Sequence, residues 1–302
     1  MDIAPGLSIL IPVYNRDVTG LVRALLAQAP AWDGPVEIIC LDDASEVAFA
    51  ALNRGLASLA AVRYEELPEN VGRAIIRNRL AAAAHHPWLL LLDNDSVLPD
   101  ADFLSRYAHN RDRAPVLVGG TIYPAAPPTD PALRLRWLYG RLREARPAAL
   151  RQRNSHNQLT LNNMLIQADV FRRFGLDEQL TDYGHEDTKF GWLLRAAGVA
   201  VHHLDNPVLH DGLESASIFL QKTHDAVRNL ARLYLTEGLG RETKLLRTAL
   251  RLRRLGLSEA VRAAFRLRYQ QVQLNLLSGK PNLRQLDALK LYWLLEELSV
   301  SV

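Results

Sequence analysis

The run Leu7-Ser-Ile-Leu-Ile-Pro-Val13 decides the fold class. It is apolar except for Ser8 and Pro12, as expected of a strand buried on both faces of a parallel sheet. Residues 36–41 form a second such run, after a helical pattern over residues 18–26 and a breaker at Trp32-Asp-Gly-Pro35. The order is strand, helix, strand, which predicts a parallel crossover unit.

The alternation continues towards the middle of the chain. Helical spacing is expected over residues 47–59 and 73–85, and strands over residues 62–66 and 88–92. This pattern predicts an α/β fold, with a doubly wound, mainly parallel central sheet flanked by helices. In such folds ligands bind beyond the carboxyl ends of the strands.

The second half changes character after Gly119-Gly120. Residues 133–153 are rich in Arg, and later segments are expected to be strands (159–167 and 199–204) and helices (170–174 and 188–197). From residue 217 onward the pattern is almost entirely helical. We therefore expect a main body over residues 1–238, with halves at about 1–120 and 121–238, and a helical C-terminal extension over residues 239–302.

Composition limits the possible functions. The chain has 302 residues, of which 48% are hydrophobic, and a formal net charge of +3. That charge is too small to indicate a nucleic-acid partner, and the single Cys40 cannot form an internal disulfide, which favours a reducing compartment. Residues 1–6 lack the pattern of a secretory signal. We expect a cytoplasmic protein that is soluble or at most peripheral to the membrane.

The small net charge conceals an uneven distribution. Residues 240–302 contain 12 basic and 5 acidic residues, a formal charge of +7 against +3 for the whole chain. Leucines alternate with the arginines between residues 244 and 254, which predicts a basic amphipathic helix. Such a helix can lie on an anionic membrane or a partner, or it can pack back on the main body with its charged face in solvent.

Three acidic groups fall at predicted strand ends or helix starts: Asp42-Asp43, Asp93-Asn94-Asp95 and Glu186-Asp187. In a doubly wound sheet the first two meet at one edge, where their mutual repulsion favours a divalent cation with oxygen ligands. Such a cation can leave positions open for a substrate diphosphate. Taken alone, a short acidic triplet is also common turn chemistry.

Five motifs occur in a characteristic order: Ser8-Ile-Leu-Ile-Pro-Val-Tyr-Asn15, Cys40-Leu-Asp-Asp-Ala-Ser45, Asn70-Val-Gly-Arg-Ala-Ile-Ile-Arg-Asn78, Leu92-Asp-Asn-Asp-Ser96 and Gly184-His-Glu-Asp-Thr188. This series resembles the glycosyltransferase family 2 enzymes, which have the GT-A fold. The resemblance covers roughly residues 7–235. It implies transfer of a sugar from a nucleoside diphosphate donor to an acceptor hydroxyl, with inversion and with a divalent metal.

The resemblance also implies a donor site. One of Asp42 or Asp43 would recognise the base, and Arg73 and Arg77 would lie near the base or the diphosphate. The other residues implied at the donor are Pro12, Tyr14 and Asn15, which border the nucleotide, and Asp93 and Asn94 at the end of the fourth strand.

The implied catalytic site has a metal and a base. Asp95 would ligate Mn²⁺ or Mg²⁺ directly, with His210 as a further ligand and Asp93 facing the ribose or a metal-bound water. Asp187 would act as the general base, and Glu186 beside it would bind the acceptor. A single base opposite the leaving group implies one in-line displacement, hence inversion.

Four residues are expected at the acceptor: Asn162, Asn163, His185 and Trp192. Asn162 and Asn163 are also compatible with turn chemistry, and Trp192 with a place in the core. The chain departs from the family pattern at Ala44 and Ile76, and at His185, which limits the space beside the base.

These observations predict a metal-dependent inverting glycosyltransferase that uses a nucleotide sugar, with UDP as the expected nucleotide, and a glycan or lipid-linked acceptor. A nucleotidyltransferase on a similar sheet is one alternative, although Val13-Tyr-Asn-Arg16 lacks the Gly-rich loop expected there. A non-catalytic glycan-binding or membrane-binding protein that keeps the fold is the other.

Overall fold

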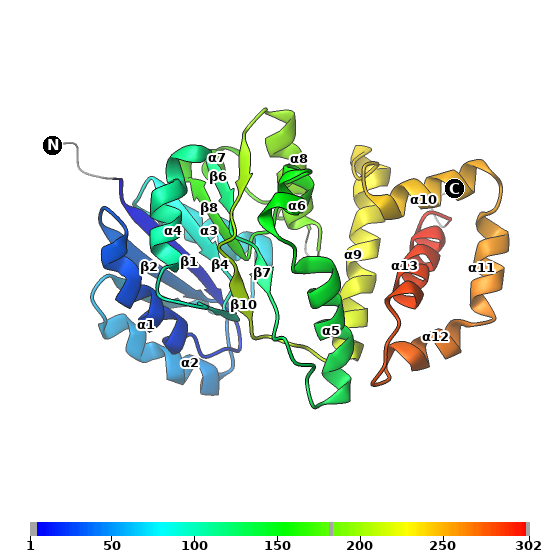
Figure 1. Ribbon diagram of the computed structural model, residues 1–302, viewed down its shortest axis with the longest axis horizontal. Helices are drawn as coiled ribbons and strands as arrows, with labels where there is room; N and C mark the ends of the chain where they lie inside the picture. The colour runs from blue at the N-terminus through cyan, green and yellow to red at the C-terminus, as the bar shows by residue number, and fades with distance from the viewer. Residues whose placement is uncertain (1–4, 181–183, 300–302) are drawn as a thin grey trace. The chain divides into compact units, whose positions relative to one another are not determined.

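A computed structural model describes residues 5–180 and 184–299, and the chain divides into two compact units (Figure 1). Unit 1 comprises residues 1–123, 144–181 and 186–212. Unit 2 comprises residues 124–143, 182–185 and 213–302.

A seven-stranded sheet forms the centre of unit 1, with the strand order β3-β2-β1-β4-β8-β6-β9. The pairs β3–β2, β2–β1, β1–β4 and β6–β9 are parallel, whereas β8 runs antiparallel to both of its neighbours. The prediction of a mainly parallel sheet is confirmed. The strands are β1 (Leu7–Val13), β2 (Val36–Asp42), β3 (Val62–Glu66), β4 (Trp88–Leu92), β6 (Val116–Val118), β8 (Asn163–Gln167) and β9 (Val201–His203).

Both faces of this sheet are buried, which explains the apolar run that opens the chain. Along β1, Ile9 and Ile11 face one core, which is completed by α1 (Thr19–Gln28) and α4 (Phe103–Asn110). Leu10 faces the opposite core, completed by α3 (Arg73–Ala83), α7 (Ala168–Phe174) and α8 (Glu186–Ala196). Successive side chains of a strand point to opposite faces, so a strand covered on both sides must be apolar throughout. Cys40 on β2 is fully buried in the first core, where burial raises the pKa of its thiol to about 12.

A small three-stranded sheet in unit 1 carries part of the site. Its order is β5-β10-β7, from β5 (Ser96–Val97), β7 (Thr121–Ile122) and β10 (Val208–His210). The strands β5 and β10 are antiparallel, and His210 pairs with Ser96. This register brings the end of β10 to the turn that follows β4.

Several predicted elements are shorter than expected, two of them markedly. The helix predicted over residues 47–59 is α2 (Val47–Asn53) followed by a 3₁₀ turn (Arg54–Ser58). The strand predicted over residues 159–167 begins only at Asn163, because its partner β4 ends at Leu92, opposite that residue. The remaining helix of unit 1 is α6 (Ala148–Gln152).

Unit 2 is helical and assembles around α13 (Leu283–Glu297), which contacts α9 (Ala216–Glu237), α10 (Lys244–Arg254), α11 (Ser258–Arg266) and α12 (Tyr269–Leu276) (Figure 1). Helix α5 (Arg134–Tyr139) packs on α9. The division therefore differs from the boundary expected at residue 238: α9 and residues 124–143 go with the C-terminal helices because α9 packs against both α5 and α13.

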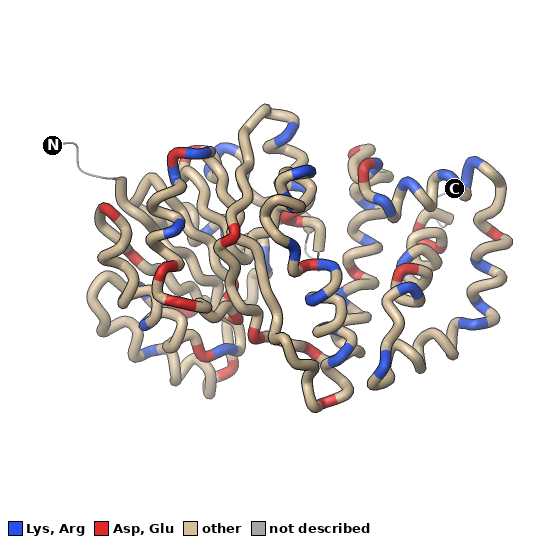
Figure 2. The backbone as a smooth tube through the Cα atoms, in the orientation of Figure 1, with Lys and Arg blue, Asp and Glu red and all other residues tan. Residues whose placement is uncertain are grey.

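No helix in residues 5–180 and 184–299 combines the length and the apolar composition needed to cross a bilayer. Basic residues are frequent on α10 and α11 (Figure 2), in agreement with the charge asymmetry of the sequence.

Candidate active site

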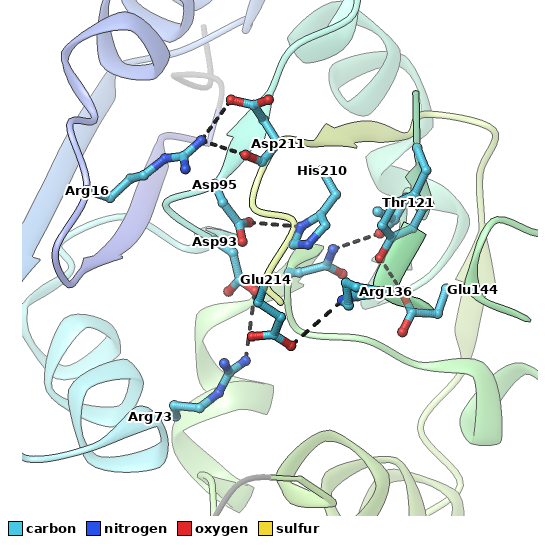
Figure 3. A network of polar contacts seen from close by, with 12 residues as sticks. Arg16, Arg73, Asp93, Asp95, Thr121, Arg136, Glu144, His210, Asp211 and Glu214 are labelled. Atoms are coloured by element: carbon cyan, nitrogen blue, oxygen red, sulfur yellow. Dashed lines mark hydrogen bonds and ion pairs between the residues drawn. The ribbon is translucent and has the colours of Figure 1, made fainter. Parts of the chain in front are cut away.

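The turn after β4 places Asp95 beside His210. The backbone N–H of Ser96 donates to the carbonyl of Asp93 at 3.1 Å, which closes the turn and turns the chain into β5. Because β5 pairs with β10, the Asp95 carboxylate lies 3.2 Å from Nδ1 of His210 (Figure 3). The predicted pair of metal ligands is therefore brought together by the small sheet.

The surroundings keep Asp95 ionised. Burial by itself would raise the pKa of this carboxyl, but the hydrogen bond and charge of His210, together with Arg16 and Arg73, outweigh burial and lower it. The backbone of Gly212 also passes so close that a Cβ there would overlap the Asp95 carboxylate. Asp95 is thus a charged oxygen donor in a confined position.

Asp95 and His210 fit a divalent cation as a two-residue donor set. A carboxylate oxygen and an imidazole nitrogen at this separation can share one cation, and Mg²⁺ or Mn²⁺ commonly keeps further positions for water and phosphate oxygens. The part of the chain that is described contains no group of three or more His, Cys, Asp or Glu side chains placed to hold a metal. Asp93, predicted as a third ligand, does not join the pair.

Asp93 is instead held by the arginines of α3. Its carboxylate forms an ion pair with Arg77 and lies 3.9 Å from Arg73. Arg77 is buried, and its second donor binds the carbonyl of Arg73 at 3.0 Å. Arg77 therefore positions Asp93 and is too enclosed for the predicted diphosphate contact. Arg73 is more exposed, so its guanidinium remains accessible to a diphosphate.

Arg73 also reaches the first turn of α8. Its Nε donates to Glu186 at 3.0 Å. The guanidinium of Arg73 thus lies between Asp93, in the turn after β4, and Glu186, at the start of α8. Glu186 is buried and ion-paired, which makes it a positioning group and not the acceptor ligand that the sequence predicted.

The two adjacent carboxyl groups of α8 have opposite pKa shifts. Burial and the neighbouring charge of Glu186 raise the pKa of Asp187 from near 3.8 to about 6. For Glu186, burial is outweighed by Arg73 and Arg77, which lower its pKa. Asp187 is therefore the carboxylate with the greater affinity for a proton, as a general base that operates near neutral pH requires.

The edge beyond β1 and β2 contains the predicted donor residues. Asp42 accepts hydrogen bonds from the backbone of Ser45 and the hydroxyl of Tyr64, both at 2.7 Å. Asp43 accepts from the N–H groups of Val71 and Gly72, at 2.7 and 3.1 Å. These bonds fix the loop after β2 and the start of α3, so both carboxylates already have structural partners.

The loop after Pro12, in β1, is tied to the loop after β2. Asn15 has a positive φ of 47°, donates its N–H to Ser45 and accepts from the N–H of Glu46, both at 2.8 Å. The neighbouring Tyr14 leaves its ring half exposed, while its carbonyl accepts from Asn94 at 3.2 Å. An exposed aromatic ring on a fixed loop is suited to contact a base.

Of the predicted acceptor residues in unit 1, only Asn162 is placed for the role. Its amide donates to Thr121 at 2.7 Å, and its side-chain oxygen has no partner within the described residues. The expectation was wrong for Asn163, which is fully buried, accepts from Tyr107 and donates to two carbonyls. It was also wrong for Trp192, which is buried in α8 and offers no stacking surface. His185 belongs to unit 2 and has a φ of 73°.

Two arginines were missed by the sequence analysis. Arg16 donates to the carboxylate of Asp211 at 2.8 Å and to its carbonyl at 2.9 Å, which fixes the residue after His210 (Figure 3). Arg151 is buried and donates to the carbonyls of three residues at the ends of the sheet, Val118, Gly119 and Leu204. Neither arginine stands in a motif, and only the fold shows what each one binds.

Comparison with known proteins agrees with this geometry. The family model described as glycosyl transferase family 2 matches residues 8–178, more than half of the chain. The chain belongs to glycosyltransferase family 2. Validoxylamine A glucosyltransferase of Streptomyces hygroscopicus subsp. limoneus is 30% identical over 224 residues, which are 65% of this chain and 49% of that protein. The chain thus spans about half the length of this curated relative.

Solved structures show the same GT-A fold. The mannosyltransferase PcManGT from Pyrobaculum calidifontis, in complex with GDP-Man and Mn²⁺, has a TM-score of 0.59 at 17% identity, over 99% of this chain and 89% of that one. TarS 1–349 of S. aureus, in complex with UDP, has a TM-score of 0.50 at 15% identity, over 97% and 89%. Membership in family 2 argues against the nucleotidyltransferase alternative.

The raised pKa of Asp187 predicts a pH-dependent effect on stability. The folded state holds this proton more tightly than the unfolded chain, so ionisation of Asp187 destabilises the fold as the pH rises through about 6. We expect Asp187→Asn to increase the free energy of unfolding by about 1–2 kcal/mol at pH 8 and to have no such effect at pH 4. Urea denaturation at both pH values tests this. Asp33→Asn, at an exposed position, is the control, and a loss of stability at pH 8 in Asp187→Asn would contradict the assignment.

Proposed function

We propose that this protein transfers a sugar from a nucleoside diphosphate sugar, with UDP as the nucleotide, to an acceptor hydroxyl with inversion. The observation that carries the proposal is the position of Arg73, within 3.0 Å of Glu186 and 3.9 Å of Asp93. It links the start of α8, with its proton-accepting Asp187, to the turn that holds Asp95. A base and a cation-binding turn that share one cluster suit attack by a hydroxyl on a carbon that carries a diphosphate.

In the proposed reaction, Asp187 removes the proton of the acceptor hydroxyl as the oxygen bonds to the anomeric carbon and the bond to the diphosphate breaks. The charge of Glu186 raises the proton affinity of Asp187, and Arg73 keeps Glu186 ionised. A divalent cation held by Asp95 and His210 would supply positive charge for the departing diphosphate. A single displacement with the base opposite the leaving group gives inversion.

The relatives support the choice of donor and metal. PcManGT was solved with GDP-Man and Mn²⁺, and TarS with UDP. The curated relative is named as a glucosyltransferase. The resemblance of the sequence motifs favours UDP for this chain, and a glycan or a lipid-linked hydroxyl remains the proposed acceptor class.

The role of Asp187 predicts a selective loss of transfer. General bases contribute about 10²–10⁴-fold to rate, so Asp187→Asn should lower transfer at least ~100-fold, while the Kd of the donor changes less than about twofold. Release of UDP or GDP from a panel of nucleotide sugars with Mn²⁺ and simple glycosides measures transfer, and calorimetry measures donor binding. Asp33→Asn should retain full activity. Near-normal turnover by Asp187→Asn would refute the base assignment.

The role of Asp95 predicts a loss of metal-dependent nucleotide binding. Removal of the carboxylate leaves His210 as a lone ligand, so Asp95→Ala should abolish the increase in UDP affinity that Mn²⁺ produces. Calorimetric titration of UDP with and without Mn²⁺ tests this, with Asp33→Asn as the control again. An unchanged Mn²⁺ effect in Asp95→Ala would rule out Asp95 as a ligand.

We also propose that the C-terminal helices contact an anionic membrane surface from the cytoplasmic side. Five leucines of unit 2 between residues 255 and 277 are exposed, in the segment that follows the Arg-rich helix α10 and includes α11, and Leu267 has an exposed fraction of 89%. The five are Leu255, Leu257, Leu267, Leu274 and Leu277. Exposed apolar side chains beside arginines suit the boundary between lipid head groups and acyl chains.

Vesicle sedimentation tests this contact. The protein should sediment with vesicles that contain about one-third anionic lipid, bind them less as salt rises, and bind neutral vesicles weakly. The double variant Leu267→Gln/Leu274→Gln should bind at least about threefold less, whereas Leu52→Gln, which changes an exposed leucine of unit 1, should have no effect. Equal binding to neutral and anionic vesicles would contradict the proposal.

A further inference from the structure

Unit 2 contains a pocket lined by none of the residues assigned to the donor, the metal or the base, although it includes His185, which was expected at the acceptor. Its volume is about 500 Å³, within the range of small-molecule sites. Residues of α9, α10 and α13 line most of it, and α13 packs on both α9 and α10 in unit 2 (Figure 1). All of the lining residues belong to unit 2.

The wall of the pocket is mostly apolar. Val227 and Leu230 of α9 are buried, and Leu245 of α10 and Leu291 of α13 are partly buried. Ala226 and Ala288 add small side chains that leave the space open. Covering such a wall with a hydrocarbon chain is favourable, by about 25 cal/mol for each Å² of apolar surface that is buried.

The charged residues of the pocket leave an excess of positive charge. Arg143 and Asp287 neutralise each other through an ion pair at 2.7 Å. Lys290 lies 5.8 Å from the ring centroid of Tyr139, with no carboxylate partner among the described residues. Lys244 has no ion-pair partner among the described residues either.

The start of α10 adds backbone donors at the same place. Lys244 and Leu245 are its first two residues and both line the pocket. The N-cap Thr243 accepts only from the N–H of Leu246, at 3.3 Å, so the N–H groups of Lys244 and Leu245 have no acceptor among the described residues. Free N–H groups and the positive end of a helix favour an anion, here beside the ammonium of Lys244.

We propose that this pocket binds an acidic amphiphile, with its alkyl or prenyl chain on the wall formed by α9 and α13 and its anionic head group at Lys244 and the start of α10. An uncharged hydrocarbon would leave the cations without a partner, and a free anion would leave the apolar wall exposed. Only a molecule with both parts satisfies both features. The inference does not depend on the proposed transfer reaction.

Calorimetry with the full chain tests the proposal. Dodecyl phosphate, kept below its critical micelle concentration, should bind with a stoichiometry near one, whereas dodecanol should bind at least about fivefold more weakly and inorganic phosphate should not bind detectably. Laurate distinguishes the two kinds of head group: similar affinity indicates a general anion site, and weaker binding indicates a phosphate site. Both results support the pocket as an acidic-amphiphile site.

Two variants locate the ligand. Lys244→Met removes the charge but keeps an unbranched chain, and should weaken dodecyl phosphate at least about fivefold with no effect on dodecanol. Ala288→Phe fills the pocket from a solvent-exposed position of α13, and should weaken both. Arg253→Met removes one charge from the same helix outside the pocket and should leave binding within about twofold.

Three outcomes would overturn the proposal: no binding of dodecyl phosphate, equal affinity for dodecanol, or equal effects of Lys244→Met and Arg253→Met. If Ala288→Phe proves unfolded by circular dichroism, the comparison of Lys244→Met with Arg253→Met still decides the matter. The Asp187→Asn variant should bind dodecyl phosphate normally, so failure of this site is distinguishable from failure of the catalytic proposal.

Discussion

The site of unit 1 depends on the ion pairs between the carboxylates that the fold brings together and the few basic side chains that lie among them. Asp93 and Asp95 come from the turn after β4, and Glu186 and Asp187 from the start of α8. A buried carboxylate is costly to ionise without a positive partner. Arg77 and Arg73 supply that partner for Asp93 and Glu186. Asp95 has His210. Both arginines come from the first turns of α3, so the position of this one helix governs most of the cluster.

Because of these ion pairs, the two adjacent carboxyl groups on α8, Glu186 and Asp187, have different roles. Glu186 is buried and paired, so it remains an ion and acts on its neighbour through its charge. Asp187 accepts hydrogen bonds from Thr188 but has no ion-pair partner among the described residues, and burial together with the charge of Glu186 raises its pKa. A base has to hold a proton only for part of the cycle, and a pKa near 6 permits this at neutral pH. This difference in pKa between the two carboxyl groups would be lost if Arg73 were displaced, because Glu186 and Asp187 would then compete for one proton.

The two units have contrasting chemistry. Unit 1 buries a parallel sheet between helices and gathers acidic groups at the ends of its strands. Unit 2 is helical, carries the excess positive charge, and contains a largely apolar pocket whose charged residues are Arg143, Lys244, Lys290 and Asp287. Under the proposed function, the acidic site of unit 1 would use a divalent cation to bind a nucleotide sugar, and the basic unit 2 would favour an anionic or amphipathic ligand.

The sequence by itself determined the class of fold and the principal residues, because both depend on local patterns. Apolar runs such as Leu7–Val13 can be stable only between two layers, and the motifs around Asp95 and Asp187 are contiguous in the chain. Tertiary structure alone decided which candidates have free functional groups. Asn163 and Trp192 were expected at the acceptor but are buried, and Arg77 forms an ion pair with Asp93. Three features join residues that are far apart in the sequence. They are the contact of Asp95 with His210, the ion pair of Arg16 with Asp211, and the pocket around Lys244. No local pattern encodes such pairings, since they arise from strand register and helix packing.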